Sequence, residues 1–123
     1  MPVDKRIKDK NSQDQSPQEI SLNDILSTSD EGLHILVFST SWLGAGEIYS
    51  GYVTGLAAEL NLSVEPSFID VDHQKELARF FAIEQSPTTI LLFKQEILDR
   101  FVGVISRKKL RKRILDNRDM LDA

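Results

Sequence analysis

A run of strand-favouring residues at 33–38 sets the architecture, because it is apolar at consecutive positions with His34 as the exception. A strand with one face in water alternates apolar and polar side chains, whereas a strand buried on both faces is apolar throughout. Residues 33–38 are therefore predicted to form a central strand, with His34 as an interior or edge histidine. An amphipathic helix at 49–60 and a strand at 64–71 follow, which predicts a β-α-β unit.

Five further segments complete the expected order of elements. They are a short helix after the cap residue Ser21, a helix from the cap residue Asp72 to Phe81, strands at 88–93 and 97–102, and a final helix after the cap residue Ser106. The connection around 95–96 is short enough only for an antiparallel hairpin. This order predicts an α/β fold in which a central mixed sheet carries helices on both faces.

The start of the chain differs in composition from the rest. Residues 1–18 have almost nothing to bury, so we expect a disordered polar tail there and one folded domain at 19–123. The total of 123 residues is the usual size of a single domain. The first ten residues are mostly charged and contain no apolar run of the kind found in a signal peptide. No stretch of the chain approaches the roughly 18 consecutive apolar residues that a membrane-spanning helix needs. We therefore expect no signal peptide, no membrane contact and a cytoplasmic location.

Three segments carry a resemblance to the thioredoxin family over roughly residues 20–118. Residues 38–46, Phe-Ser-Thr-Ser-Trp-Leu-Gly-Ala-Gly, stand where the family has an apolar strand followed by Trp-Cys-Gly-Pro-Cys at the start of a long helix. The segment 86–88, Ser-Pro-Thr, is similar to the family's cis-proline segment, and Gly103 is similar to its glycine before the last helix. The resemblance implies a thioredoxin-like fold with a cis peptide bond before Pro87.

The chain departs from the family at the positions that carry its chemistry. Leu43 and Gly46 stand where redox-active members have two cysteines, and Ala45 replaces the proline between them. Val37 stands where active thioredoxins often carry a buried acid that helps to move protons. The chain has no cysteine, and thiol–disulfide exchange requires a thiolate. We therefore expect a redox-inactive member of the family that has no catalytic residue and is not an enzyme.

The resemblance also implies a surface for binding a protein or an extended peptide segment. In the family, the backbone before the cis-proline pairs with a substrate strand, and this pairing needs no thiol. The residues predicted to form this surface are Trp42, Leu43, Gly44, Ala45, Ser86, Pro87 and Gly103. A structural alternative is that Trp42 only packs over the helix start and Pro87 only fixes a turn. The expected function is that of a binding, scaffold or chaperone-like module, or else of an accessory protein of redox homeostasis that works with a cysteine-bearing oxidoreductase.

Other groups of reactive residues predict less chemistry. Asp70, Asp72 and His73 come nearest to a metal site, but a capping aspartate beside a solvated loop is the more common role, so no metal is expected. The loop 44–46 could hold an anion through free N–H groups, yet it lacks the Gly-Lys-Ser ending of a nucleotide loop, and Glu47 follows it. No cofactor is expected.

Charge is distributed unevenly along the chain. Residues 11–99 hold three cations and fourteen acids, whereas residues 100–118 hold eight cations and one acid. The cations that crowd the last helix are Arg107, Lys108, Lys109, Arg111, Lys112 and Arg113. Their simplest role is to pair with the acidic remainder of the chain, and binding of an acidic partner is the next alternative. Nucleic acid is less favoured, because this segment offers no aromatic side chain for base stacking.

Overall fold

The computed structural model describes residues 19–40 and 42–122. The predicted polar tail, 1–18, lies outside the described residues. In chain order the elements are α2 (Leu22–Ser29), β1 (His34–Ser39), α3 (Ala45–Glu59), β2 (Ser67–Asp70), α4 (Lys75–Phe80), β3 (Thr88–Phe93), β4 (Glu96–Val102) and α5 (Arg107–Asp122). Within the described ranges, no helix has both the length and the apolar character needed to cross a membrane.

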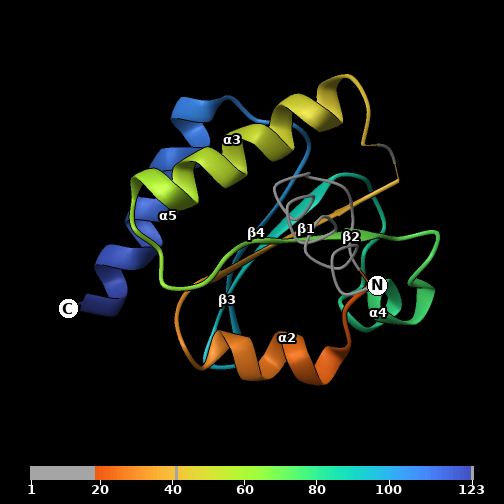
Figure 1. Cartoon of the computed structure of the whole chain (residues 1–123), viewed down its shortest axis with the longest axis horizontal. Coiled ribbons are helices and arrows are strands. Elements are labelled where there is room, and N and C mark those ends of the chain that lie inside the picture. The colour runs from red at the N-terminus through yellow and green to blue at the C-terminus, as the bar shows by residue number, and fades with distance from the viewer. Residues whose placement is uncertain (1–18, 41, 123) are drawn as a thin grey trace, which may run out of the picture.

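The strands form a mixed sheet in the order β2-β1-β3-β4. β1 runs parallel to β2 and antiparallel to β3, and β3 pairs antiparallel with β4. Figure 1 shows α3 and α5 on one face of this sheet and α2 and α4 on the other. The predicted architecture, a mixed sheet with helices on both faces, is therefore confirmed.

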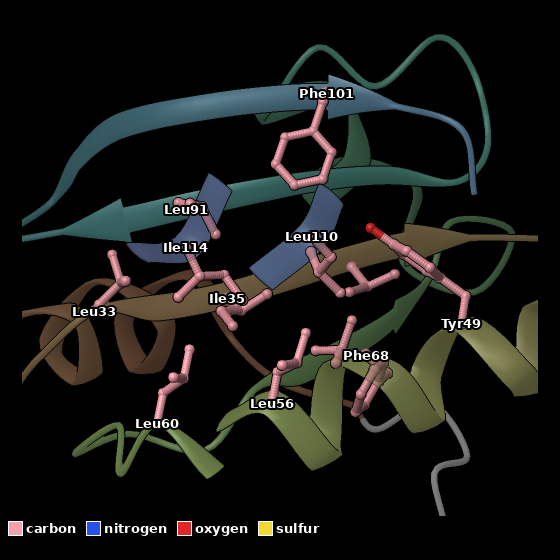
Figure 2. Packing of buried hydrophobic residues seen from close by; sticks show 12 residues of the cluster. Leu33, Ile35, Tyr49, Leu56, Leu60, Phe68, Leu91, Phe101, Leu110 and Ile114 are labelled. Carbon is pink, nitrogen blue, oxygen red and sulfur yellow. The ribbon is translucent and has the colours of Figure 1, made fainter. Parts of the chain in front are cut away.

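β1 is buried along its whole length between β2 and β3. Its alternate side chains enter two cores: Ile35 and Val37 belong to the core under α3 and α5, whereas Leu36 and Phe38 belong to the core under α2 and α4. Figure 2 shows the first core, where side chains of the sheet meet those of α3 and α5. The four side chains are at most 1% exposed. The consecutive apolar run thus reflects a strand with a core on each side.

His34 points into the second of these cores and is 1% exposed. Its Nε2 atom lies 2.9 Å from the hydroxyl oxygen of Ser67 on β2. The predicted interior position is confirmed, but the expectation that the ring is fully satisfied is not, because Nδ1 of His34 is buried and forms no hydrogen bond to a described residue. Burial lowers the pKa of His34 from 6.5 to about 4, so the imidazole is neutral at pH 7.

The turn between β3 and β4 consists of Lys94 and Gln95, one residue earlier than predicted. Both residues have positive φ, 48° and 67°, as a type I′ hairpin turn requires. Neither is the asparagine or glycine that such a turn favours. Instead, the buried Ser29 at the end of α2 holds the turn. Its carbonyl accepts the N–H of Lys94 at 2.8 Å, and its hydroxyl accepts the N–H of Gln95 at 3.0 Å.

The capping residues predicted for α2 and α5 are confirmed, and the one predicted for α4 is wrong. The hydroxyls of Ser21 and Ser106 each accept a main-chain N–H three residues further on. Asp72 does not cap α4, because the carboxylate of Asp70 accepts the N–H of Asp72 at 2.8 Å and holds this segment in a turn. The helix therefore begins only after Gln74.

Two elements differ in length from their predictions. β2 is shorter than the predicted strand 64–71, because it begins after Pro66, which has no N–H to donate to a strand ladder. α3 begins at Ala45, one turn before the first residue of the apolar pattern at Tyr49. The start of α3 therefore lies inside the segment that carries the family resemblance.

Candidate functional site

The predicted binding residues lie at one end of the sheet, where β1 and β4 end and β3 begins. β3 runs antiparallel to both neighbours, so its start is level with their ends: Thr88 pairs with Phe38 on one side and with Val102 on the other. The loops at this end and the first residue of α3 contain the seven residues predicted for the surface, Trp42, Leu43, Gly44, Ala45, Ser86, Pro87 and Gly103. Topology thus brings together three segments that are far apart in the chain.

Ser86 connects the segment before β3 to the end of β1. Its hydroxyl oxygen accepts the N–H of Thr40 at 2.9 Å and lies 3.1 Å from the hydroxyl oxygen of Ser39. Within the described residues, the main-chain N–H and C=O of Ser86 form no hydrogen bond, and the residue is exposed. One main-chain donor and one main-chain acceptor are therefore available here to an incoming segment. The sequence predictions omit Ser39 and Thr40, although their hydroxyls directly precede the predicted loop.

Pro87 and Gly103 join the start of β3 to the end of β4. The peptide bond between Ser86 and Pro87 is cis, as the resemblance implies. The N–H of Gly103 donates to the carbonyl of Pro87 at 2.8 Å. Gly103 has a φ of 98°, which side chains rarely allow, and no atom lies within 4 Å of the place that its Cβ would take. The backbone is therefore open to a ligand at this point.

Trp42 and Leu43 are neighbours with different surroundings. The indole of Trp42 is half-buried and meets the ring of Phe68 edge-on, with 5.8 Å between the ring centres. Its Nε1 is buried without a hydrogen-bond partner among the described residues. Leu43, in contrast, is 80% exposed. The packing alternative therefore fits the indole of Trp42, whereas Leu43 leaves most of its apolar side chain in solvent.

The loop before α3 leaves a second stretch of backbone open. Gly44 precedes the first residue of the helix with a φ of 61°, and no atom lies within 4 Å of the place that its Cβ would take. Ala45 is exposed. Glu47 lies in the first turn and already supplies negative charge to the positive end of the helix. This arrangement suits an uncharged segment better than an anion.

Beneath the loop, the position expected to hold an acid in active relatives is apolar. Val37 is 1% exposed and pairs in register with Thr89 of β3. The Thr89 hydroxyl lies 2.6 Å from the hydroxyl of Tyr49 on α3, and burial raises the pKa of Tyr49 to about 12. This pair is absent from the sequence predictions, because Tyr49 enters them only as part of an apolar stripe. The sequence signal for it is Thr89, one of two threonines that precede the apolar residues of β3.

The residues nearest to a metal site in the sequence instead close a turn. The carboxylate of Asp70 accepts the N–H groups of Asp72 and His73 and lies 3.6 Å from the His73 ring. Within ranges 19–40 and 42–122, no three His, Asp or Glu side chains form a group that could hold a metal ion.

The arginines of the predicted basic cluster pair with acids of the protein itself. Arg107 and Arg111 both bind Glu59 of α3, and Arg113 binds Asp99 of β4. Hydrogen bonds from these arginines hold the pKa values of both carboxyls below their ordinary range. Pairing with the acidic remainder of the chain is therefore confirmed for these three arginines.

Comparison with known proteins agrees with the geometry. The thioredoxin family model matches residues 16–116. The thioredoxin H-type of Ricinus communis is 33% identical over 73 residues, which cover 59% of this chain and 61% of that protein. Thioredoxin Y1, chloroplastic, of Arabidopsis thaliana is 29% identical over 97 residues, which cover 79% of this chain and 56% of that protein. The chain thus spans about three fifths of the length of these curated relatives.

Solved structures show the same fold. The thioredoxin of Fasciola hepatica is 27% identical with a TM-score of 0.67, over 78% of this chain and 90% of that one. A mutant thioredoxin from Halobacterium salinarum is 25% identical with a TM-score of 0.68, over 82% of this chain and 86% of that one.

These relatives contradict the expectation that the chain is not an enzyme. They are named thioredoxins, and thioredoxins are disulfide oxidoreductases. The expectation is wrong in its reasoning as well, because the lack of a thiol excludes one reaction and not enzyme activity in general. Because the thioredoxin family model matches residues 16–116, which are most of this chain, the chain belongs to the thioredoxin family. It is a divergent member without the Cys-x-x-Cys motif.

Proposed function

We propose that this chain binds extended protein segments, as a scaffold or chaperone-like module, at a peptide surface formed by residues 42–45, Ser86, Pro87 and Gly103. The observation that carries the proposal is the main chain of the exposed residue Ser86, whose donor and acceptor have no partner among the described residues. An extended segment satisfies such a pair in the way that a neighbouring strand does. This binding needs no cysteine.

The surroundings of Ser86 support the approach of a segment. Gly44 and Gly103 present backbone with nothing within 4 Å of their missing side chains, so a chain can lie close to either. The hydrogen bond from the N–H of Thr40 to the Ser86 hydroxyl, and the one between the hydroxyls of Ser39 and Ser86, hold this residue in place before binding. A site that is already ordered loses less entropy when it binds.

Leu43 supports an apolar contribution to the affinity. Its side chain is 80% exposed, and full burial of a leucine contributes up to about 2 kcal/mol. That free energy corresponds to about thirtyfold in affinity. Ile48, in the first turns of α3, is a second exposed apolar side chain, at 56%.

A binding experiment with Leu43→Ser tests the proposal. Trp42 is the single tryptophan of the chain, so its fluorescence reports on this surface. The probes are labelled, unstructured ten-residue peptides with alternating apolar and polar side chains. We expect Leu43→Ser to weaken binding by roughly tenfold to thirtyfold. Met120→Ser, which changes an apolar side chain that is 75% exposed near the end of α5, is the matched control and should bind like the wild type.

A second arm tests the main-chain pairing. Each residue of the best peptide is N-methylated in turn, which removes one main-chain donor at a time. One position should lose most of the affinity, because its N–H donates to the carbonyl of Ser86. The proposal fails if no peptide binds, if Leu43→Ser binds as tightly as the wild type, or if methylation has the same small effect at every position.

A second candidate function is to present a bound segment to a cysteine-bearing oxidoreductase. Membership of a family of disulfide oxidoreductases, in a chain with no cysteine of its own, favours it. The test measures how fast a thioredoxin with both cysteines reduces a disulfide in a peptide that binds this chain. Acceleration that disappears in Leu43→Ser supports this role, and a rate that this chain leaves unchanged counts against it.

A further inference from the structure

The four arginines of α5 are all engaged by the protein itself. Arg107, Arg111 and Arg113 bind the carboxylates of α3 and β4 described above. Arg118 donates from Nη1 to the carbonyl of Leu60, at the end of α3, at 2.6 Å. Planar guanidinium groups suit such fixed, directed contacts. These contacts link α5 to α3 and to the sheet, and Figure 1 shows the two helices side by side on the same face of the sheet.

The three lysines of the same helix are used differently. Lys108 and Lys109 are exposed and form no ion pair with any described residue. Lys112 bonds only to Asp116, one turn further along α5, at 2.9 Å, and its side chain is 75% exposed. Exposed pairs of this kind contribute little to stability. The positive charge of the lysines is therefore left for solvent or for a partner.

A groove lies along these lysines. Its volume is about 580 Å³, and Ser106, Arg111 and the lysines line it together with Leu115. Leu115 is half-buried, because it also packs against the core under α3 and α5. All the residues that line the groove are Ser106 or members of α5, so it lies between side chains of one helix and places exposed cations beside Leu115.

We propose that this lysine face, formed by Lys108, Lys109, Lys112 and Leu115, docks an acidic segment of a partner protein. Carboxylates of the segment lie against the lysines, and one apolar side chain rests on Leu115. Lys108 and Lys112 are one helical turn apart and Lys109 lies beside them, so their positive charges lie on one side of the helix. The face shares no residue with the peptide surface and acts independently of it.

Charge complementarity favours an acidic protein segment over nucleic acid. Asp116 and Asp119 line the same groove. A nucleic acid carries a phosphate at every nucleotide and would bring negative charge against these carboxylates. An acidic peptide places its carboxylates only where the lysines are. Residues 107–122 also contain no aromatic side chain on which a base could stack.

The test uses a labelled ten-residue peptide with four glutamates around one leucine, and fluorescence anisotropy at low salt. The variant is Lys108→Gln/Lys109→Gln/Lys112→Gln. The control, Lys75→Gln/Arg79→Gln/Lys94→Gln, removes the same charge from exposed cations outside α5. We expect the lysine variant to bind about tenfold more weakly and the control variant to stay within about twofold of the wild type. Circular dichroism confirms that both variants are folded.

Further probes separate the possible partners. Replacing the glutamates of the peptide by glutamine should abolish binding, and replacing its leucine by serine should weaken it severalfold. Leu43→Ser should leave this binding unchanged, so failure here and failure at the peptide surface can be told apart. Equal binding by the lysine variant, the control variant and the wild type overturns the proposal, as does tighter binding of a single-stranded oligonucleotide of equal charge.

Discussion

Replacing His34 by glutamine should remove part of the acid sensitivity of the fold. His34 is 1% exposed, and its Nε2 lies 2.9 Å from the hydroxyl of Ser67 in the neighbouring strand. Burial penalises the charged imidazole, which lowers the pKa of His34 from 6.5 to about 4. The unfolded chain keeps the ordinary value, because its histidine is in water.

The size and sign of the effect follow from this difference. As the pH falls below 6.5, the unfolded chain takes up a proton that the folded chain takes up only near pH 4. The unfolded state binds more protons in this window, so the free energy of unfolding decreases as the pH falls. A difference of about 2.5 pH units corresponds to about 3 kcal/mol, which is lost between pH 6.5 and pH 4. That is a large part of the stability of a small domain.

Urea unfolding followed by Trp42 fluorescence at several pH values between 7.5 and 4 measures this effect. Between these limits, the wild type should lose about 3 kcal/mol more than His34→Gln. Carboxylates held by arginines also lose stabilisation in acid, but they do so in both proteins and cancel in the comparison. His73→Gln, which removes the other histidine, with a side chain that is 88% exposed, is the control variant. Equal losses in wild type and His34→Gln would refute the reasoning.

Three further predictions concern stability. Val37→Asp places a carboxylate in an apolar core and should lower the free energy of unfolding by several kcal/mol at pH 7.5. The loss should be smaller at pH 5, where the buried acid takes up a proton, and equal losses in urea unfolding at both pH values would contradict this. Gly103→Ala should destabilise by about 1 kcal/mol because of its positive φ, whereas Gly55→Ala in helix α3 should stabilise by up to about 1 kcal/mol; thermal unfolding distinguishes the two signs. Arg113→Lys loses the two-pronged bond to Asp99 and should raise the pKa of that carboxyl, which NMR titration measures.

The order of elements could be predicted because its signals are local. Residues 33–38 indicate a strand with two cores, and the hydroxyls of Ser21 and Ser106 stand where helix caps are needed. The prediction for Asp72 was wrong because Asp70, two residues earlier, captures the same segment in a turn. Two neighbouring aspartates can each accept main-chain N–H groups, and only the folded backbone decides between them.

The α/β architecture, the family resemblance and the absence of a thiol could all be read from the sequence alone. Hydrophobic periodicity and the chemistry of the side chains are properties of the chain before it folds. The exposure of Leu43 and the packing of Trp42 on Phe68 became known only from the tertiary structure. The same is true of Ser86, whose hydroxyl binds residues more than 40 positions away while its main chain stays unpaired among the described residues. The tertiary structure also separates the six cations at 107–113 into two groups. The arginines bind acids of other elements, whereas the lysines form no ion pair with any other described element. Exposure and pairing depend on contacts between distant segments, and these contacts exist only once the sheet and its helices are assembled.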